Sequence, residues 1–409
     1  MKPGKRPHYA WAVCAGCALL LFCTSGLSIN AFTVYQPYIL TRNGLTNAQS
    51  SMIVTVRSLT SFGSMLLTGL YYKKLSLRAG MGLAGALAAA GFFLFGAAGS
   101  FFAYCLAAAV AGMAYGFGTM IPVSMVMERW FIEKRTLAVG LCSAATGLAT
   151  LGIPSLLTRL IERHGLAETF FAEAAVIAGL VLLSFLLIRS RPADVGLTPY
   201  GSWDAVDHES FSVHGRALTG RDWALLIPLL LCVGAFTGAG YSHITVLARG
   251  EGFDPAAIAL AVTLSGVTLM AGKFAYGVLA EKIGTYASNW LFGGLLTAGL
   301  VLCCVTGGRT PLLMTAMVTY GLGLSLGTVG ITAWAGDLAS HEQYDGTVRR
   351  FQTVYAAGGL LFSGLPGLLA DRFGGSYVPA YMVFTACAVF AVLAIQWLYR
   401  RSGAKHDAK

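Results

Sequence analysis

Two cationic side chains lie in stretches that are otherwise apolar. Lys273 is the one charged residue between Asp254 and Glu281. An ammonium group in hydrocarbon is costly unless it faces water, a partner or a ligand. Arg57 lies inside a second predicted membrane span. A ligand that binds at this ammonium group has to neutralise its positive charge. The pattern therefore predicts that an anion binds at Lys273.

Arg57 is open to two interpretations. It lies about 10 Å from the nearer end of its predicted helix. Its long side chain can therefore extend to the lipid headgroups or serve as a structural hydrogen-bond clamp. The alternative is that Arg57 and Lys273 flank one central cavity and bind the same ligand. Two cations would suit a dicarboxylate, whereas Lys273 alone would suit a monocarboxylate.

Further polar residues within the predicted spans extend this candidate site. His243 lies near the end of a predicted helix, and histidine titrates near physiological pH. It is therefore a candidate for carrying a proton, with a hydrogen-bonded structural role as the alternative. Glu173 lies near the start of another helix, where we expect it to be wetted or paired. The hydroxyl and amide donors that would complete a binding site are Asn30, Tyr115, Tyr320 and Tyr355.

The sequence does not favour an enzyme. It has no H-E-x-x-H motif and no cluster with zinc-ligand spacing. Cys14 and Cys17 form a C-x-x-C pair, but they lie on an apolar helix without a second pair, and we interpret them as small packing residues. We therefore predict no catalytic residues, no cofactor and no metal site.

The composition indicates what must position these residues. Of 409 residues, 56% are hydrophobic and 11% are charged, with a mean hydropathy of +0.68. A soluble domain carries about 25% charge, and a spanning helix needs about 20 apolar residues. The sequence therefore predicts an all-α integral membrane protein with twelve spans. These are expected near residues 9–38, 47–72, 79–99, 101–127, 136–160, 168–188, 223–248, 255–280, 287–307, 311–335, 348–370 and 377–399.

The net charge of +10 follows the membrane topology and does not indicate nucleic-acid binding. With a cytoplasmic N-terminus, the inside segments hold 20 Lys and Arg residues and the outside loops hold 6. The positive-inside rule then favours cytoplasmic positions for both termini. We expect a multi-pass protein of a cell inner membrane.

A single long hydrophilic segment divides the spans six and six. The predicted organisation is an N-terminal six-helix bundle at 1–188, a cytoplasmic linker at 189–222, and a C-terminal six-helix bundle with a short cytoplasmic tail at 223–409. Short motifs recur between the halves: Gly152 and Gly364 begin similar stretches 212 residues apart, and Gly69 and Gly277 end equivalent helices. The recurrence indicates a duplicated six-helix unit.

With twelve spans in a 6+6 plan and basic loops after helices 2 and 8, the chain resembles the major facilitator superfamily. Particular stretches are similar to its monocarboxylate-porter and oxalate:formate-antiporter branch. Residues 272–284 (GKFAYGVLAEKIG) are similar to that branch's helix 8 pattern, G-R-x-x-x-G-x-L-x-D-x-x-G. Residues 130–140 are similar to its helix 4–5 loop, and residues 191–197 to its exit from helix 6.

The resemblance implies that Lys273 takes the place of the helix 8 arginine that holds the substrate carboxylate. The lysine is a departure, since arginine grips a carboxylate with two parallel hydrogen bonds and lysine is a point charge. Glu281 stands where the family has Asp, and with Gly277 and Gly69 it is expected to contribute to gating. Leu269 occupies a position where some members carry an acid.

These observations predict a secondary active transporter of small organic anions, with lactate-like monocarboxylates as the expected substrates. It would work by alternating access, as a proton-coupled symporter or an anion exchanger. The alternatives are a dicarboxylate exchanger for oxalate-like compounds and a proton-coupled drug exporter. The expected partners are a small carboxylate, protons and the lipid bilayer, with no nucleic acid, and the expected state is a monomer.

Overall fold

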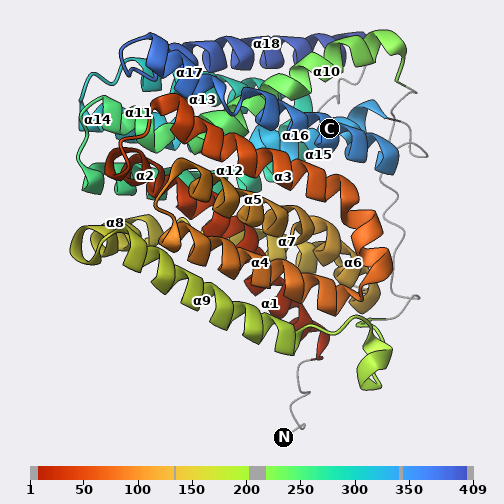
Figure 1. Cartoon of the computed structure of the whole chain (residues 1–409). Coiled ribbons are helices and arrows are strands. Elements are labelled where there is room, and N and C mark those ends of the chain that lie inside the picture. The colour runs from red at the N-terminus through yellow and green to blue at the C-terminus, as the bar shows by residue number, and fades with distance from the viewer. Residues whose placement is uncertain (1–7, 133–134, 202–217, 340–343, 403–409) are drawn as a thin grey trace, which may run out of the picture. The chain divides into compact units, whose positions relative to one another are not determined.

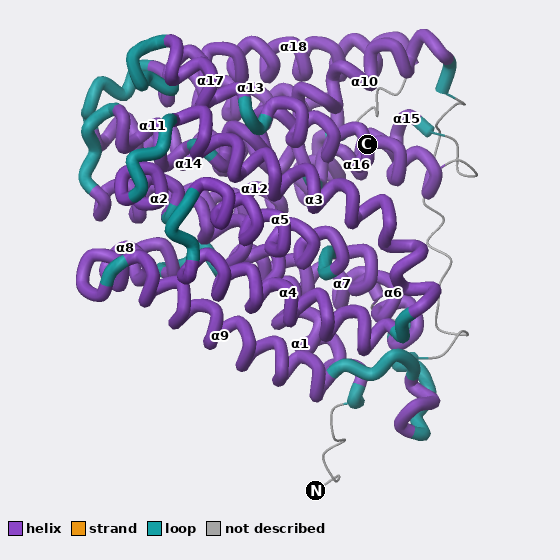
Figure 2. The backbone as a smooth tube through the Cα atoms, viewed as in Figure 1, coloured by secondary structure: helices purple, strands orange, loops and turns teal. Residues whose placement is uncertain are grey.

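The computed structural model describes residues 8–132, 135–201, 218–339 and 344–402. Within these residues the chain forms helices joined by turns (Figure 2), and a single isolated bridge between Phe131 and Tyr200 is the only strand-like pairing. Residues 202–217 of the predicted linker and residues 403–409 of the predicted tail lie outside the described residues.

Twelve helical stretches in the described part of the chain are long and apolar enough to cross a membrane, which confirms the predicted all-α membrane fold. Their bounds lie close to the predicted ones. They are Ala10–Val34, Asn47–Lys74, Leu77–Ala97, Phe101–Trp130, Ala138–His164, Leu166–Leu187, Gly220–Gly240, Pro255–Ala280, Thr285–Cys304, Thr310–Leu338, Gly346–Arg372 and Val378–Arg401.

Local sequence explains where several helices begin and end. Ser76 precedes α4 (Leu77–Ala97) and its side chain accepts a hydrogen bond from the amide of Ala79, which is a usual N-cap contact. Gly284 separates two spans and has a φ of +82°. Side chains other than glycine rarely adopt that conformation, so a glycine allows the sharp reversal between α12 and α13.

The chain divides into two compact units. Unit 1 comprises Met1–Phe32, Leu59–Ala149 and Leu160–Ser210, and unit 2 comprises Thr33–Ser58, Thr150–Arg159 and Phe211–Lys409. Unit 2 therefore contains two segments from the first half of the sequence. Because of them, the units differ from the domains at 1–188 and 223–409, which remain a prediction. Helices α3 (Asn47–Lys74) and α8 (Ile153–His164) each continue from one unit into the other.

Unit 1 is built around α4, which packs against α5 and α9, while α1 packs against α7 and α9. The rings of Phe92, Phe95 and Phe170 lie in its interior, with centroids 5.4–6.1 Å apart. Its remaining helices are α1 (Ala10–Leu21), η1 (Phe22–Asn30), α5 (Phe101–Phe117), α6 (Met120–Trp130), α7 (Arg135–Leu148), α9 (Leu166–Leu187) and η3 (Pro192–Val195), as labelled where there is room in Figure 1.

Unit 2 contains the remaining helices. Within it α13 packs against α14 and α18, α12 packs against α14, and α10 packs against α16 and α18. The bounds are η2 (Ala31–Val34, which begins in unit 1), α2 (Gln36–Arg42), α10 (Gly220–Gly234), η5 (Ala235–Gly240), α11 (Ile244–Gly250), α12 (Pro255–Ile283), α13 (Thr285–Cys304), α14 (Thr310–Gly323), η6 (Leu324–Gly327), α15 (Val329–Leu338), α16 (Tyr344–Phe362), α17 (Leu365–Arg372) and α18 (Val378–Ser402).

Glycines allow a close approach of two helices in unit 2. A Cβ atom at Gly234 of α10 would overlap the carbonyl oxygen of Tyr355 in α16. A Cβ atom at Gly358 of α16 would overlap the carbonyl oxygen of Leu231. Small residues on both helices therefore allow this backbone-to-backbone contact.

The first and seventh spans share an irregularity that sequence reasoning missed. The first span continues from α1 into the π-helix η1, and the seventh continues from α10 into the π-helix η5. Gly26 in η1 and Gly238 in η5 lie 212 residues apart, the same offset as the recurring motif. Wide π-helical turns are rare and often lie at functional sites.

Candidate functional site

Lys273 lies in α12 and is partly exposed. Its ammonium group makes no hydrogen bond or ion pair with any residue that the structure describes. A lysine in the middle of a 29-residue apolar helix is costly without a partner. The charge is thus available to a group that is not part of the described chain.

The face of α12 that carries Lys273 differs between its two ends. Gly266, Lys273 and Gly277 point within about 40° of one another around the helix axis. At one end, a Cβ at Gly266 would overlap the side chain of Thr150, so this end is tightly covered. At the other end, a Cβ at Gly277 would meet nothing within 4 Å. Lys273 lies between the covered and the open end.

The neighbours of Lys273 in α12 hold it in place. Gly272 packs against the backbone of Leu322 in α14. Tyr276 is fully buried, and its hydroxyl donates a hydrogen bond to Oδ1 of Asn289 at 2.7 Å. The indole of Trp334 donates to the same oxygen at 2.8 Å. One face of α12 is therefore anchored in the core, which holds the backbone that carries Lys273.

Arg57 lies in a different environment. Its side chain is 4% exposed, and it interacts with other parts of the protein. The surrounding protein covers the guanidinium, which disfavours extension to the lipid headgroups. The two interpretations left for Arg57 are a structural role and a contact with the substrate.

The two cations differ in depth. Both spans begin on the side opposite the chain termini; Arg57 is ten residues from Asn47, where α3 begins, and Lys273 is eighteen from Pro255, where α12 begins. Eight residues correspond to about 12 Å along a helix axis. The idea that both flank one cavity would therefore require the two side chains to extend toward each other.

His243 is fully buried and both its ring nitrogens have partners. Nδ1 lies 2.9 Å from the carbonyl oxygen of Ala239, and Nε2 lies 2.8 Å from Oγ of Ser51. Because a carbonyl oxygen only accepts, we assign the proton to Nδ1, and the neutral ring then accepts from Ser51. This geometry gives His243 a structural role, while its role as a proton carrier stays a prediction.

A carboxylate caps the beginning of α3. Asp371 of α17 accepts hydrogen bonds from the backbone amides of Asn47 and Ala48, at 3.0 and 2.8 Å, and from the side-chain amide of Asn47 at 2.9 Å. The hydroxyl of Tyr377 donates to Oδ1 of Asn47 at 3.1 Å. A negative charge at a helix N-terminus is favourable because it satisfies free amides and the helix dipole.

The same face of α3 continues this contact. The hydroxyls of Thr55 and Ser363 lie 2.9 Å apart. A Cβ at Gly367 would overlap the carbonyl oxygen of Asn47 and the side chain of Ser51, so this glycine allows α17 to approach α3. We call these residues the α3–α17 contact: Asn47, Ser51, Thr55, Ser363, Gly367 and Asp371.

Tyr320 and Tyr355 belong to unit 2, whereas Asn30 belongs to unit 1. Tyr320 is fully buried and donates to the carbonyl oxygen of Phe236 in η5, so its hydroxyl already serves the fold. Tyr355 is half-buried, with its hydroxyl 3.1 Å from that of Thr237. Asn30, in unit 1, donates to the carbonyl oxygen of Thr146 at 3.2 Å.

The other predicted residues show no tight packing. Tyr115, also in unit 1, is half-buried and interacts within the protein. A Cβ at Gly69 would meet nothing within 4 Å, as at Gly277. The side chain of Glu281 lies outside the described residues. The gating roles of Gly69, Gly277 and Glu281 remain predictions. Neighbouring atoms leave room for a larger side chain at both glycines.

Two polar residues escaped sequence reasoning. Asp371 is a single acid at the end of a span, and nothing in the sequence links it to Asn47, 324 residues away. Gln36 at the start of α2 is 3% exposed, and neither of its amide atoms has a hydrogen-bond partner among the described residues. A glutamine within an apolar span is the only signal that would have marked it.

Curated relatives of this chain include transporters of several kinds. The chain is 25% identical over 401 residues to the aspyridones efflux protein apdF of Emericella nidulans, covering 95% of this chain and 78% of that protein. It is 23% identical to the oxalate:formate antiporter of Oxalobacter formigenes, covering 88% and 82%. It is 24% identical to monocarboxylate transporter 13 of Bos taurus, covering 65% and 60%.

Solved structures share the architecture. The structure of the nucleoside transporter NupG superposes with a TM-score of 0.72 at 13% identity, covering 96% of this chain and 99% of that one. The sequence profile of the Major Facilitator Superfamily matches residues 18–254 and 229–409. This match spans most of the chain and agrees with its twelve candidate spans, so the chain belongs to the major facilitator superfamily.

Proposed function

We propose that this chain is a secondary transporter of small, lactate-like monocarboxylates that works by alternating access. The observation that carries the proposal is the ammonium group of Lys273, which has no partner among the described residues and lies in an apolar span. A carboxylate would neutralise this charge. The relatives named as an oxalate:formate antiporter and a monocarboxylate transporter support a carboxylate as the ligand.

Neutralising Lys273 also supplies a reason for coupling between binding and conformational change. An unpaired cation is costly in any state that excludes water, whereas a cation paired with a carboxylate costs less. A ligand shifts a conformational equilibrium by the difference in its affinity for the two states. The substrate would therefore favour the states in which Lys273 is enclosed.

The α3–α17 contact supplies a surface that can open. It lies on the side opposite the chain termini and consists largely of hydrogen bonds, each of which contributes a net stabilisation of about 1 kcal/mol. Water can replace each of these partners when the helices separate. We propose that this contact closes and opens once in each transport cycle.

Monocarboxylates suit the site better than dicarboxylates. Arg57 is enclosed by protein and lies about 12 Å from the level of Lys273, by the helical rise. The two carboxylates of oxalate share one carbon–carbon bond and would not reach both cations. Selective loss of oxalate binding, but not formate binding, in Arg57→Lys would show that Arg57 is a second anchor.

The first experiment is uptake of labelled lactate, formate and oxalate into proteoliposomes that contain the purified protein. We expect Lys273→Ala to lower uptake about 10- to 100-fold and Lys273→Arg to retain it in part. Lys282→Ala, an exposed lysine near the end of the same helix, is the matched control and should transport normally. Uptake at the wild-type rate by Lys273→Ala would refute the proposal.

The mode of coupling is tested in the same vesicles. In proton-coupled symport, an acidic outer solution accelerates uptake in vesicles without internal substrate. In anion exchange, uptake instead requires a carboxylate loaded inside. The hydrogen bonds of His243 to Ala239 and Ser51 occupy both ring nitrogens, and this favours exchange.

The relative named as an efflux protein supports a second candidate, proton-coupled export of a larger compound. An exporter of cationic compounds would need an acid where Lys273 stands, so this candidate is restricted to anionic or neutral cargo. Thermal-shift measurements with lactate and with larger anionic or neutral compounds separate the two. Stabilisation by the larger compounds alone would favour export.

We also propose that the protein works as a monomer in an inner membrane, with both termini in the cytoplasm. The excess of Lys and Arg in alternate loops supports this orientation. Reporter fusions at the C-terminus and in the loop after α3 would test it, since both should report the cytoplasm.

A further inference from the structure

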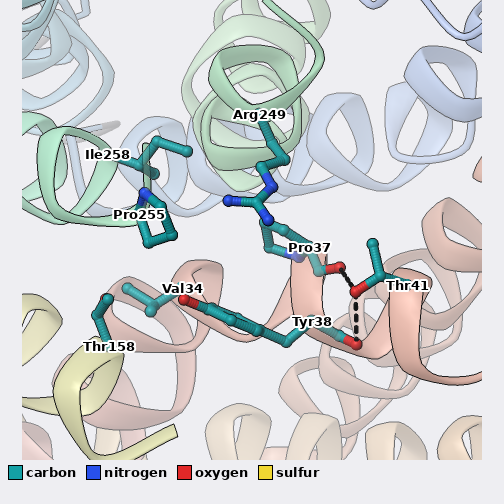
Figure 3. A pocket seen from close by; sticks show the side chains of 8 residues that line it. All are labelled: Val34, Pro37, Tyr38, Thr41, Thr158, Arg249, Pro255 and Ile258. Carbon is teal, nitrogen blue, oxygen red and sulfur yellow. Dashed lines mark hydrogen bonds between the residues drawn. The ribbon is translucent and has the colours of Figure 1, made fainter. Parts of the chain in front are cut away.

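A cleft opens within unit 2 on the side opposite the chain termini. Its walls come from η2, α2, α8, α11 and α12, and it encloses about 320 Å³ of empty space, part of which is open solvent. Figure 3 shows the side chains that line it.

Arg249 is the only charged residue among the described residues that line this cleft. Its side chain is exposed, and the guanidinium has no hydrogen-bond or ion-pair partner in the part of the chain that the structure describes. In Figure 3 the guanidinium extends from α11 into the cleft, toward the side chains of α2. Glu251 and Asp254 are near in sequence but do not line the cleft.

The rest of the wall is mainly apolar. Val34, Pro37, Pro255 and Ile258 line the cleft together with Arg249, and in Figure 3 the ring of Tyr38 lies across the floor. A lone cation with an apolar surround recognises a carboxylate attached to a small apolar body. Arginine suits this ligand because its donors match the two carboxylate oxygens.

The cleft adjoins a buried contact between Thr245 and Thr33, which we call the sealed contact. Thr245 donates a hydrogen bond to the carbonyl oxygen of Thr33 at 2.6 Å, and Val34 follows directly after Thr33. Thr245 and Arg249 are four residues apart in α11, so they lie on the same side of this short helix. One side of α11 therefore forms the sealed contact through Thr245 and presents a cation to solvent at Arg249.

We propose that Arg249 is an entry site, where a carboxylate arriving from the side opposite the termini first binds before the sealed contact opens. This inference rests on the proposed transport of monocarboxylates. It assigns a second binding position, separate from Lys273. Arg249 would contribute to capture of the substrate. Its removal should therefore raise KM for entry from the side opposite the termini and leave KM for the other side unchanged.

The kinetic test uses proteoliposomes with the protein inserted in one orientation. For lactate entering from the side opposite the termini, we expect Arg249→Gln to raise KM about threefold to tenfold with an unchanged maximal rate. KM for entry from the other side should not change. Arg249→Lys should lie between, and Arg309→Gln, an exposed arginine on the same side, is the matched control.

A second measurement does not depend on transport. Phenylglyoxal modifies exposed arginines, and mass spectrometry reports its rate at Arg249 and Arg309 in one sample. Lactate should slow modification of Arg249 alone, lactamide should not, and the protection should persist in Lys273→Ala. Absence of this protection, or an unchanged KM in Arg249→Gln, would overturn the entry site. Failure of the wild-type protein to transport carboxylates would overturn the proposed function instead.

Discussion

Two equivalent helices of the repeat, α3 and α12, have different environments. They are similar in length, at 28 and 29 residues, and both begin on the side opposite the termini. In α3 the first half carries Asn47, Ser51 and Thr55, which pair with polar groups of other helices. In α12 the corresponding positions are Pro255, Ala259 and Thr263, and the charge lies deeper, at Lys273.

Under the proposed function, this difference gives the two helices separate tasks. Every polar group of the α3–α17 contact has a partner, so this contact stabilises the packing of α3 that the structure shows. Lys273 has no partner among the described residues, so α12 carries an unsatisfied charge for a ligand. A duplicated fold can thus use one copy of a helix for closure and the other for binding.

The largest expected effect follows from removing the charge on α12. Lys273→Met should lower transport about 10- to 100-fold, because a charged hydrogen bond to the substrate is lost. The same change should raise the thermal midpoint in detergent, since replacing an unpaired charge by an apolar group stabilises by about 1 kcal/mol. A lower midpoint together with lost transport would show that Lys273 is structural.

The next effect follows from preventing closure at α3. Gly367→Leu should lower transport about tenfold, because its side chain would overlap Asn47 and Ser51. Binding of lactate, measured by thermal shift, should persist because Lys273 is unchanged. Gly63→Leu is the matched control in α3 itself, where a Cβ meets nothing within 4 Å. Equal transport by both leucine variants would contradict a closing role for the α3–α17 contact.

A smaller effect follows from weakening the cap of α3. Asp371→Asn removes a charge that accepts from two backbone amides, at a cost of about 1 kcal/mol. Hydrogen–deuterium exchange at residues 47–58 should then accelerate about fivefold. Asp254→Asn is the control, since Asp254 precedes α12 without a side-chain cap bond. Unchanged exchange at α3 would mean that the cap does not hold the contact closed.

The smallest effect concerns His243. His243→Gln keeps a donor and an acceptor near Ser51 and loses the bond to Ala239, so stability should fall by about 1 kcal/mol. The midpoint of the pH profile of lactate uptake should stay where it is in the wild type. A displaced midpoint would restore His243 as a proton carrier.

The sequence by itself determined the twelve spans and the anomaly at Lys273. Hydropathy and charge are local properties, and a lysine in an apolar run is visible without knowledge of its neighbours. The repeat offset of 212 residues was also readable, and the π-helices η1 and η5 follow it.

Only the tertiary structure decided what surrounds the other polar residues. It enclosed Arg57, gave His243 two partners and placed the hydroxyl of Tyr320 against the backbone of η5. It also joined Asp371 to Asn47 across 324 residues. Contacts between remote segments depend on how helices pack, and no local pattern of residue types records them. For that reason the sequence indicated a charge that needs an anion, and packing decided which other polar groups were already satisfied.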